Sequence, residues 1–219
     1  MKVSIIITTY LEKTKPYLDL CIESIRNLAY QDYEVIIVSR ESYQPQYEGC
    51  KTIFVDKDQF YPAEAINLGM RMSDPNSKYF FVLNDDAILT KNSIGNLVAA
   101  VGDYNMMANA ISPCDNGLAY NLMFGFPKDG VFNTIERAQY RLEELSSVVP
   151  DLMQADSIYP PGIVRQAFLC IYATLIPRKL YDAVGPWDEN FKCGQDDLDY
   201  SLRAKEKGFD LVSVLNALV

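Results

Sequence analysis

The sequence predicts an α/β fold in which a mostly parallel, twisted central sheet is flanked by helices. Short apolar runs rich in β-branched residues alternate with segments of helical periodicity, which is typical of a parallel sheet covered on both faces. The strand candidates show little alternation of apolar and polar residues, as expected for strands buried on both sides. No linker-like stretch rich in Ser, Gly or Pro interrupts the 219 residues, so we expect a single domain.

The predicted elements follow a regular order up to residue 111 and a less regular one after it. Pro16 and Pro62 suit the first turn of a helix, and Thr90 is a candidate cap for a third helix. The expected strands are 3–8, 33–38, 51–55, 78–83, 106–111, 167–176 and 209–215, and the expected helices are 16–29, 62–73, 91–101, 132–147 and 194–207. Because the carboxyl ends of parallel strands share one edge of the sheet, a ligand is expected to bind at that edge.

The composition excludes several classes of function. The net charge of −9 disfavours nucleic acid as a partner, because proteins that bind it carry a basic face. The chain has no histidine, which excludes Ser-His-Asp and Cys-His nucleophile systems and any metal site that needs imidazole. A general base that acts near neutral pH is therefore expected to be a carboxylate.

Cysteine usage and hydropathy indicate a soluble, cytoplasmic protein. The five cysteines are odd in number and lack C-x-x-C spacing, so we expect free thiols rather than disulfides or a zinc site. The first apolar run ends before Glu12 and Lys13 and is too short for the apolar core of a signal peptide. The longest apolar stretch, 167–176, has about half the length of a membrane span.

The segment FFVLNDDAILT, residues 80–90, places polar residues directly after a predicted buried strand. If the chain stays extended, Asn84 and Asp86 point to one side of the strand end and Asp85 to the other. A carboxylate at this edge can bind Mg²⁺ or Mn²⁺, which are hard cations that keep several waters and also bind diphosphate oxygens. The alternative is that these residues only form an Asx-turn and cap the next helix.

A second acidic segment, GPWDENFKCGQDDLDYSLRAKEKG, covers residues 185–208. Asp196 and Asp197 precede the helical pattern, and carboxylates in a first helical turn are favoured by the helix dipole whatever the function. Because the chain has no histidine, Asp196 and Asp197 are also candidates for the carboxylate that acts as general base. Trp187 is a candidate platform for a sugar, and a core position is an equal alternative.

These segments resemble the motifs of the family 2 glycosyltransferases of the GT-A fold, and the resemblance covers nearly the whole chain. VSIIITTY is similar to the opening strand of the family, and AINLG, residues 65–69, to its Ala-x-Asn-x-Gly helix. LNDDAIL resembles the DxD-type motif of the family. GPWDENFKCGQDD resembles its Gly-Gly-Phe-Asp-Glu-x-Phe and Gly-x-Glu-Asp motif. Each motif is weak alone, but the four occur in the order of the family and at compatible spacing.

The resemblance implies a metal-dependent transfer of a sugar with inversion at its C1 atom. It implies that Asp86 binds Mn²⁺ or Mg²⁺ and that Asp196 or Asp197, with Asp197 preferred, deprotonates the acceptor hydroxyl. The residues that it implies in substrate or nucleotide binding are Thr8, Thr9, Tyr10, Ser39, Asn67, Asn84, Asp85 and Trp187. The donor is expected to be a UDP-, GDP- or dTDP-sugar, and the acceptor a glycan, a lipid-linked molecule or a protein.

The chain departs from the family pattern at three positions. Ser39 stands where relatives have an acidic residue that contacts the base, and Ile66 where many have arginine. Many relatives have a histidine after the last strand, whereas this sequence stops at Val219, so we expect it to be a trimmed form of a longer protein. Residues 1–112 are expected to be a nucleotide-binding half and 113–219 an acceptor and catalytic half.

Two other functions remain open from the sequence. A sugar-nucleotide pyrophosphorylase would share the α/β layout, but it would be expected to open with a Gly-rich, basic phosphate loop, and TTYLEK contains no glycine. A non-catalytic module that binds a nucleotide or a glycan is the other alternative, because Ser39 and Ile66 depart from the family.

Overall fold

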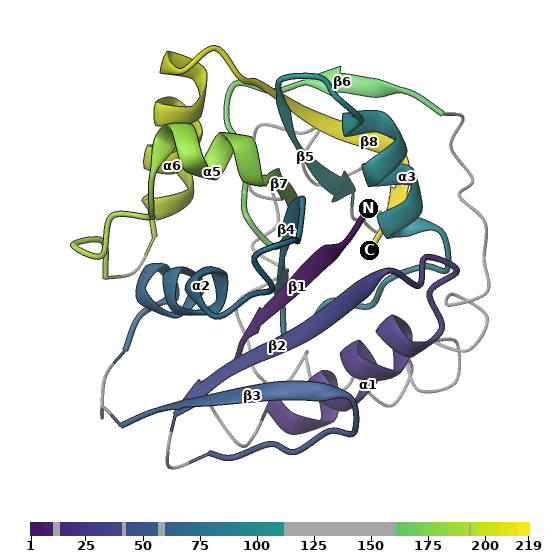
Figure 1. Ribbon diagram of the computed structural model, residues 1–219, viewed down its shortest axis with the longest axis vertical. Coiled ribbons are helices and arrows are strands. Elements are labelled where there is room, and N and C mark those ends of the chain that lie inside the picture. Colours follow the sequence, from purple (N-terminus) through teal and green to yellow (C-terminus); the bar gives the residue numbers. More distant parts are fainter. Residues whose placement is uncertain (11–13, 41–42, 57–59, 112–160, 193) are drawn as a thin grey trace, which may run out of the picture.

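The computed structural model describes residues 1–10, 14–40, 43–56, 60–111, 161–192 and 194–219, which form one sheet with helices on both faces (Figure 1). The strands are β1 (Val3–Thr8), β2 (Tyr33–Arg40), β3 (Cys50–Val55), β4 (Tyr79–Asn84), β5 (Met106–Ile111), β6 (Ile163–Arg165), β7 (Ala173–Pro177) and β8 (Asp210–Leu218). The helices are α1 (Lys15–Arg26), α2 (Pro62–Arg71), α3 (Ser93–Val101), α5 (Arg178–Val184) and α6 (Asp196–Glu206).

The eight strands lie in the order β3-β2-β1-β4-β7-β5-β8-β6. β1 pairs in parallel with β2 and β4, and β2 pairs in parallel with β3. β7 runs antiparallel between β4 and β5, β5 and β8 are again parallel, and β6 pairs antiparallel with β8. The predicted central sheet flanked by helices is therefore confirmed, and both antiparallel strands come from the second half of the chain.

Two apolar layers hold the helices against the sheet. On one face, α1 and α3 pack against β1, β4 and β5 through side chains such as Leu18, Ile22 and Leu97. On the other face lie α2, α5 and α6, which Figure 1 shows together on one side of the sheet. Gly69 lets α2 approach β1 closely, because a Cβ atom at this position would lie 2.4 Å from Cγ2 of Ile6.

The first half of the chain follows the predicted elements closely. α1 ends at Arg26 rather than at residue 29, and α2 ends at Arg71 rather than at 73. Thr90 does not cap α3, which begins at Ser93 after Asn92; its hydroxyl lies 2.8 Å from that of Ser93 instead. No helix among the described residues is long and apolar enough to cross a membrane.

The second half departs more from the prediction. Of the strand expected at 167–176 only β7 is present, because Leu169 donates its backbone N–H to the Ser201 hydroxyl of α6 rather than to a neighbouring strand. The sequence pattern does not reveal β6 or α5, which have three and seven residues and are too short to show a period. β8 continues to Leu218, beyond the expected end at 215. The candidate helix 132–147 lies outside the described residues.

Candidate active site

The carboxyl ends of β1, β2 and β4 lie level at one edge of the sheet. Thr8, the last residue of β1, is paired with Val38 of β2 on one side and with Asn84 of β4 on the other. β7 runs in the opposite direction, so its first residues reach the same edge. The carbonyl oxygen of Tyr172, just before β7, accepts the backbone N–H of Asn84 at 2.8 Å. This edge is where the sequence predicts a ligand.

The Asn84-Asp85-Asp86 motif forms a turn rather than an extension of β4. The N–H of Ala87 donates to the carbonyl oxygen of Asn84 at 3.3 Å, which closes a four-residue turn. The expectation that the alternation of the strand continues through Asp86 is therefore wrong, because the chain leaves the sheet directly after Asn84. The turn does not cap the next helix either, since α3 begins only at Ser93. Asn84 and Asp86 are exposed, whereas Asp85 is half-buried.

Asp85 ties the end of β1 to the start of α1. One of its carboxylate oxygens accepts hydrogen bonds from the hydroxyl of Thr9 at 2.6 Å and from that of Thr14 at 3.0 Å. Burial raises the pKa of Asp85, although these two hydrogen bonds act in the opposite direction. Among the described residues, the carboxylate is therefore held by neutral hydroxyl donors.

Asp86 is the carboxylate of this turn that remains accessible. Loss of hydration raises the pKa of Asp86, and no ion pair with another described residue offsets this effect. Among the described residues, no group of three or more Cys, Asp or Glu side chains forms a complete metal cage. One accessible carboxylate fits a hard divalent cation that keeps several waters and completes its coordination with substrate oxygens.

The second acidic group stands at the start of α6. Gly194 and Gln195 have positive φ angles of 77° and 65°, which bend the chain into the helix. Asp196 and Asp197 follow in the first turn, where the helix dipole favours carboxylates. Burial raises the pKa of Asp197, and the neighbouring charge of Asp196 raises it further. A carboxylate with a raised pKa at a partly buried position suits a general base.

Residues 169–172 link the two acidic segments, because the Leu169 N–H donates to the Ser201 hydroxyl of α6 at 3.1 Å and the Tyr172 carbonyl accepts the Asn84 N–H at 2.8 Å. Burial raises the pKa of Tyr10, and the charges of Asp85 and Asp196 raise it further, so the phenol lies near both. In the same way, burial and then the charge of Asp197 raise the pKa of Cys170. Cys170 precedes by two residues the Tyr172 carbonyl that binds the Asn84 N–H, and two residues span at most about 7 Å.

The Tyr10 side chain senses the charge of both acidic groups. Its ring packs against that of Phe60, with the centroids 4.9 Å apart. Its hydroxyl is buried and makes no well-formed hydrogen bond with a described residue, although the Thr8 side chain lies close enough to oppose the rise in pKa.

Asn67 and Trp187 are structural in this fold. The Asn67 side chain accepts the backbone N–H of Trp187 at 2.8 Å, and it donates to the Trp187 carbonyl and to Glu189, both at 2.9 Å. Trp187 is 2% exposed and stacks on Tyr200 with the ring centroids 4.2 Å apart. The core alternative for Trp187 therefore holds, and its ring is not a surface platform. Asn67 clamps the second acidic segment to α2.

Two neighbouring residues at the end of β2 differ in their surroundings. Ser39 is fully buried, and its hydroxyl donates to the carbonyl oxygen of Tyr43 at 2.6 Å. Arg40 is half-buried, and its guanidinium carbon lies 6.0 Å from the centroid of the Tyr10 ring. The sequence analysis missed Arg40, although a cation after a buried strand in an acidic chain was the available signal.

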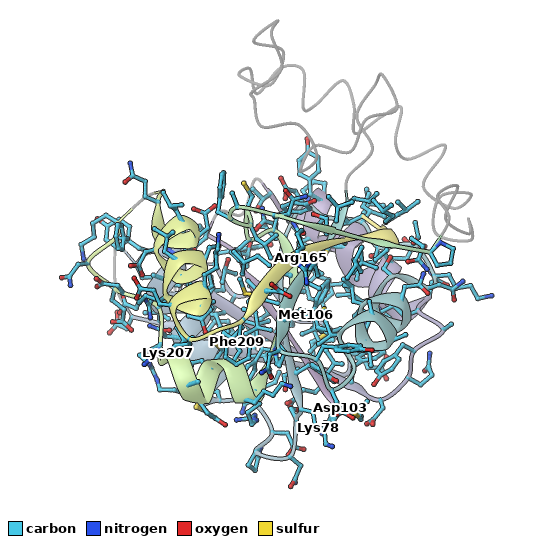
Figure 2. All side chains as sticks on the ribbon, turned by 90° about the horizontal axis from the view of Figure 1, so that it is seen from above. Lys78, Asp103, Met106, Arg165, Lys207 and Phe209 are labelled. Carbon is cyan, nitrogen blue, oxygen red and sulfur yellow. The ribbon has the colours of Figure 1, made fainter. Side chains whose placement is uncertain are left out.

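A cavity of about 380 Å³ lies at the opposite end of the sheet. Its lining includes Lys78 and Asp103, which lie close together in Figure 2. No residue that the sequence analysis proposed for a site lines this cavity. The candidate site is therefore the carboxyl edge described above.

The central eight-stranded sheet with its flanking helices is the GT-A glycosyltransferase fold. The model of glycosyl transferase family 2 matches residues 4–117. This chain belongs to glycosyl transferase family 2. No curated protein matches the chain by sequence.

Solved glycosyltransferases share the fold at low sequence identity. GalNAc-T7 with UDP, GalNAc and Mn²⁺ has a TM-score of 0.70 and 13% identity over 100% of this chain and 43% of that chain. A fragment of S. aureus TarS in complex with UDP-GlcNAc has a TM-score of 0.64 and 13% identity over 97% of this chain and 58% of that fragment. The mannosyltransferase PcManGT from Pyrobaculum calidifontis, with GDP-Man and Mn²⁺, has a TM-score of 0.64 and 14% identity over 99% and 55%. This chain therefore spans about half the length of these proteins.

Proposed function

We propose that this chain is a catalytic domain that transfers a sugar from a nucleotide-sugar donor to an acceptor hydroxyl, with inversion and with a divalent cation. The observation that carries the proposal is that the turn after β4 and the first turn of α6 present acidic groups to the same edge, around Tyr10 and residues 170–172. Membership of glycosyl transferase family 2 supports the same class of reaction.

On the donor side, Asp86 is the proposed ligand of Mn²⁺ or Mg²⁺, which when bound neutralises charge on the departing diphosphate. Asn84, exposed at the same turn, is placed to contact the ribose or a water of the cation. Thr8, Thr9 and Tyr10 shape the nucleoside side of the site. Asp85 acts through the hydroxyls of Thr9 and Thr14, because it fixes the turn that presents Asp86.

On the acceptor side, Asp197 takes the proton of the acceptor hydroxyl while the hydroxyl oxygen attacks C1 of the sugar. The bond between C1 and the diphosphate oxygen breaks, its electron pair leaves with the diphosphate, and the configuration at C1 inverts. Asp196 assists because its charge raises the pKa of Asp197, which makes Asp197 a stronger base. Helix α6 and the clamp from Asn67 hold these residues in line with the donor.

The proposed donors are UDP-, GDP- or dTDP-sugars, and two solved relatives of this fold are complexes with UDP-GlcNAc and GDP-Man. The proposed acceptor is a glycan, a lipid-linked molecule or a protein. Residues 1–112 form the nucleotide-binding half in this proposal, and 113–219 contain the acceptor side and the base. We also propose that the domain works in the cytoplasm, where nucleotide sugars and reduced cysteines coexist.

The test is the release of nucleoside diphosphate from a panel of UDP-, GDP- and dTDP-sugars, measured with Mn²⁺, with Mg²⁺ and with a chelator. We expect release to require a cation, and the anomeric configuration of the product, read by NMR, to be opposite to that of the donor. Retained configuration would exclude Asp197 as the base of a single displacement. Cation-dependent nucleotide binding without turnover would instead favour a non-catalytic binding module.

A further inference from the structure

We propose that Arg40 selects the nucleobase of the donor, and that it favours a base edge with two adjacent hydrogen-bond acceptors, as in guanine or cytosine, over uracil or thymine. The inference rests on the proposed function, because it concerns the nucleotide bound at the same edge of the sheet. It is carried by the position of Arg40, by the aromatic rings beside it and by its buried Nε, which has no hydrogen-bond partner among the described residues.

Arg40 lies at the correct distance from the diphosphate end of the site. It is the last residue of β2, two positions beyond Val38, which is level with the end of β1. β1 separates β2 from β4, so the ends of β2 and β4 are about 10 Å apart at a strand spacing of about 4.8 Å. A nucleotide with its diphosphate at Asp86 therefore crosses the end of β1 and brings its base to Arg40.

The surroundings of Arg40 are those of a flat aromatic ligand. Its guanidinium lies 6.0 Å from the Tyr10 ring, and Tyr10 in turn packs on Phe60, whose centroid is 4.9 Å away. Aromatic rings and the guanidinium plane of arginine are the surfaces on which nucleobases stack. The three side chains come from the segments that follow β1, end β2 and precede α2, and all three lie at the carboxyl edge.

Arg40 has one buried N–H donor with no partner in the part of the chain that the structure describes. Its Nε atom is buried without a hydrogen bond. Three other arginines are all engaged: Arg165 with Asp210, Arg178 with the Ser77 carbonyl, and Arg203 with Asp199. Buried N–H groups are normally hydrogen-bonded because an unpaired one is costly. A ligand that supplies acceptors would remove this cost.

The chemistry of the guanidinium decides which base fits. Arginine has donors only, arranged in a fork that matches two neighbouring acceptors, such as O6 and N7 of guanine. Cytosine offers N3 and O2 in the same way. In uracil and thymine the N3–H donor separates the two carbonyl oxygens, so the fork meets one acceptor at a time. Ser39 does not compensate, because it is fully buried and its hydroxyl donates to Tyr43.

The test is calorimetric titration of the whole chain with GDP, CDP, UDP and ADP in the presence of Mn²⁺. We expect the wild type to bind GDP or CDP at least about tenfold more tightly than UDP and ADP, as one two-point contact allows. Arg40→Gln should reduce this preference to less than about threefold and leave UDP affinity nearly unchanged. Arg40→Lys keeps the charge but not the fork, so it should lose the preference as well.

Arg165→Gln is the matched control, because Arg165 (labelled in Figure 2) lies on β6, the edge strand at the opposite side of the sheet from β2 and β3. Its nucleotide preference should equal that of the wild type. A wild type that prefers UDP, or an Arg40→Gln variant that weakens all four nucleotides equally, overturns the inference and leaves the proposed function standing. No Mn²⁺-dependent binding of any nucleotide overturns both. The relative order of GDP and CDP identifies which of the two bases is read.

Discussion

The two ends of the parallel sheet handle charge in opposite ways. At the amino ends of the strands, two carboxylates are paired with cationic groups. Lys2 binds Asp74 at 2.5 Å, and the N-terminal ammonium of Met1 lies 3.1 Å from Asp32. Arg178 donates to the carbonyl oxygens of the turn before β4. The hydrogen bond from Lys2 lowers the pKa of Asp74, as expected of a carboxylate with a cationic partner.

At the carboxyl ends, Asp86, Asp197 and Arg40 make no ion pair with any described residue. Asp86 and Asp197 have raised pKa values because burial penalises their charged forms, and no described cation pairs with them. Arg40 lies at the same edge without an acidic partner among the described residues. The local order there comes from hydrogen bonds with neutral donors, namely the Asn67 amide and the threonine hydroxyls on Asp85. Charges paired within the protein stabilise it, whereas unpaired ones at a shared edge are available to a ligand.

The largest expected effect is on turnover at the carboxyl edge. Asp197→Asn should lower kcat about 10²–10⁴-fold, the usual contribution of a general base, while Mn²⁺-dependent nucleotide binding stays unchanged. Asp86→Asn should lower kcat and should also weaken the Mn²⁺-dependent binding of the nucleotide. Steady-state kinetics measure turnover and calorimetry measures nucleotide binding, so the two effects can be told apart. Glu206→Gln on the same helix is exposed and should behave as the wild type in both. Full turnover by Asp197→Asn would remove its assignment.

The next effect is on stability, at the neutral clamp. Asn67→Ala leaves the N–H and the carbonyl of Trp187 without their partner in a buried place, so the free energy of unfolding should fall by about 2–5 kcal/mol. Chemical denaturation measures this loss. Asn190→Ala, an exposed asparagine in the adjacent turn, should cost less than about 0.5 kcal/mol. Similar losses in the two variants would show that the clamp does not hold the acidic segment.

A smaller effect concerns pH, and its sign should differ between the two ends. The pKa of Asp86 is raised in the fold, so folding favours its protonated form. As the pH rises from 3.8 through the raised pKa, the Asp86 side chain loses its proton and the folded state becomes less stable. The pKa of Asp74 is lowered, so Asp74 stabilises the fold above 3.8 and this contribution disappears as pH falls through the lowered pKa.

Melting temperatures of the wild type, Asp86→Asn and Asp74→Asn between pH 3 and pH 7 measure this difference. Relative to the wild type, Asp86→Asn should gain stability as pH rises, and Asp74→Asn should lose it. If the melting temperatures of the two variants changed with pH in the same direction relative to the wild type, the difference in charge pairing between the two ends of the sheet would be refuted.

The smallest effect is expected from Lys2→Gln at the amino edge. Lys2 is accessible to water and its ion pair is screened by salt, so the melting temperature should fall only slightly, and less at high ionic strength. Nucleotide binding and turnover should not change. A loss of nucleotide binding in this variant would connect the amino edge to the site and contradict the separation of the two ends.

The sequence was most informative where local pattern and tertiary environment agree. The strands and helices up to Ile111 were predicted with small errors at their ends, because each buried parallel strand is a continuous apolar run and each helix keeps its own period. β7 was predicted six residues too long at its start, since the Leu169 N–H binds a helix side chain, which no periodicity reports.

The sequence by itself determined which chemical groups were available: carboxylates without histidine, acidic residues after β4 and before α6, and the apolar runs of a parallel sheet. Only the tertiary structure decided which of these groups are used inside the protein. It placed Trp187 in the core, bound Asp85 to two threonines, and left Asp86 and Arg40 without an ion-pair partner among the described residues. The physical reason is that residue type is given by the chain itself, whereas burial and pairing depend on contacts between segments that are distant in the sequence, such as Asp85 with Thr9 and Trp187 with Asn67.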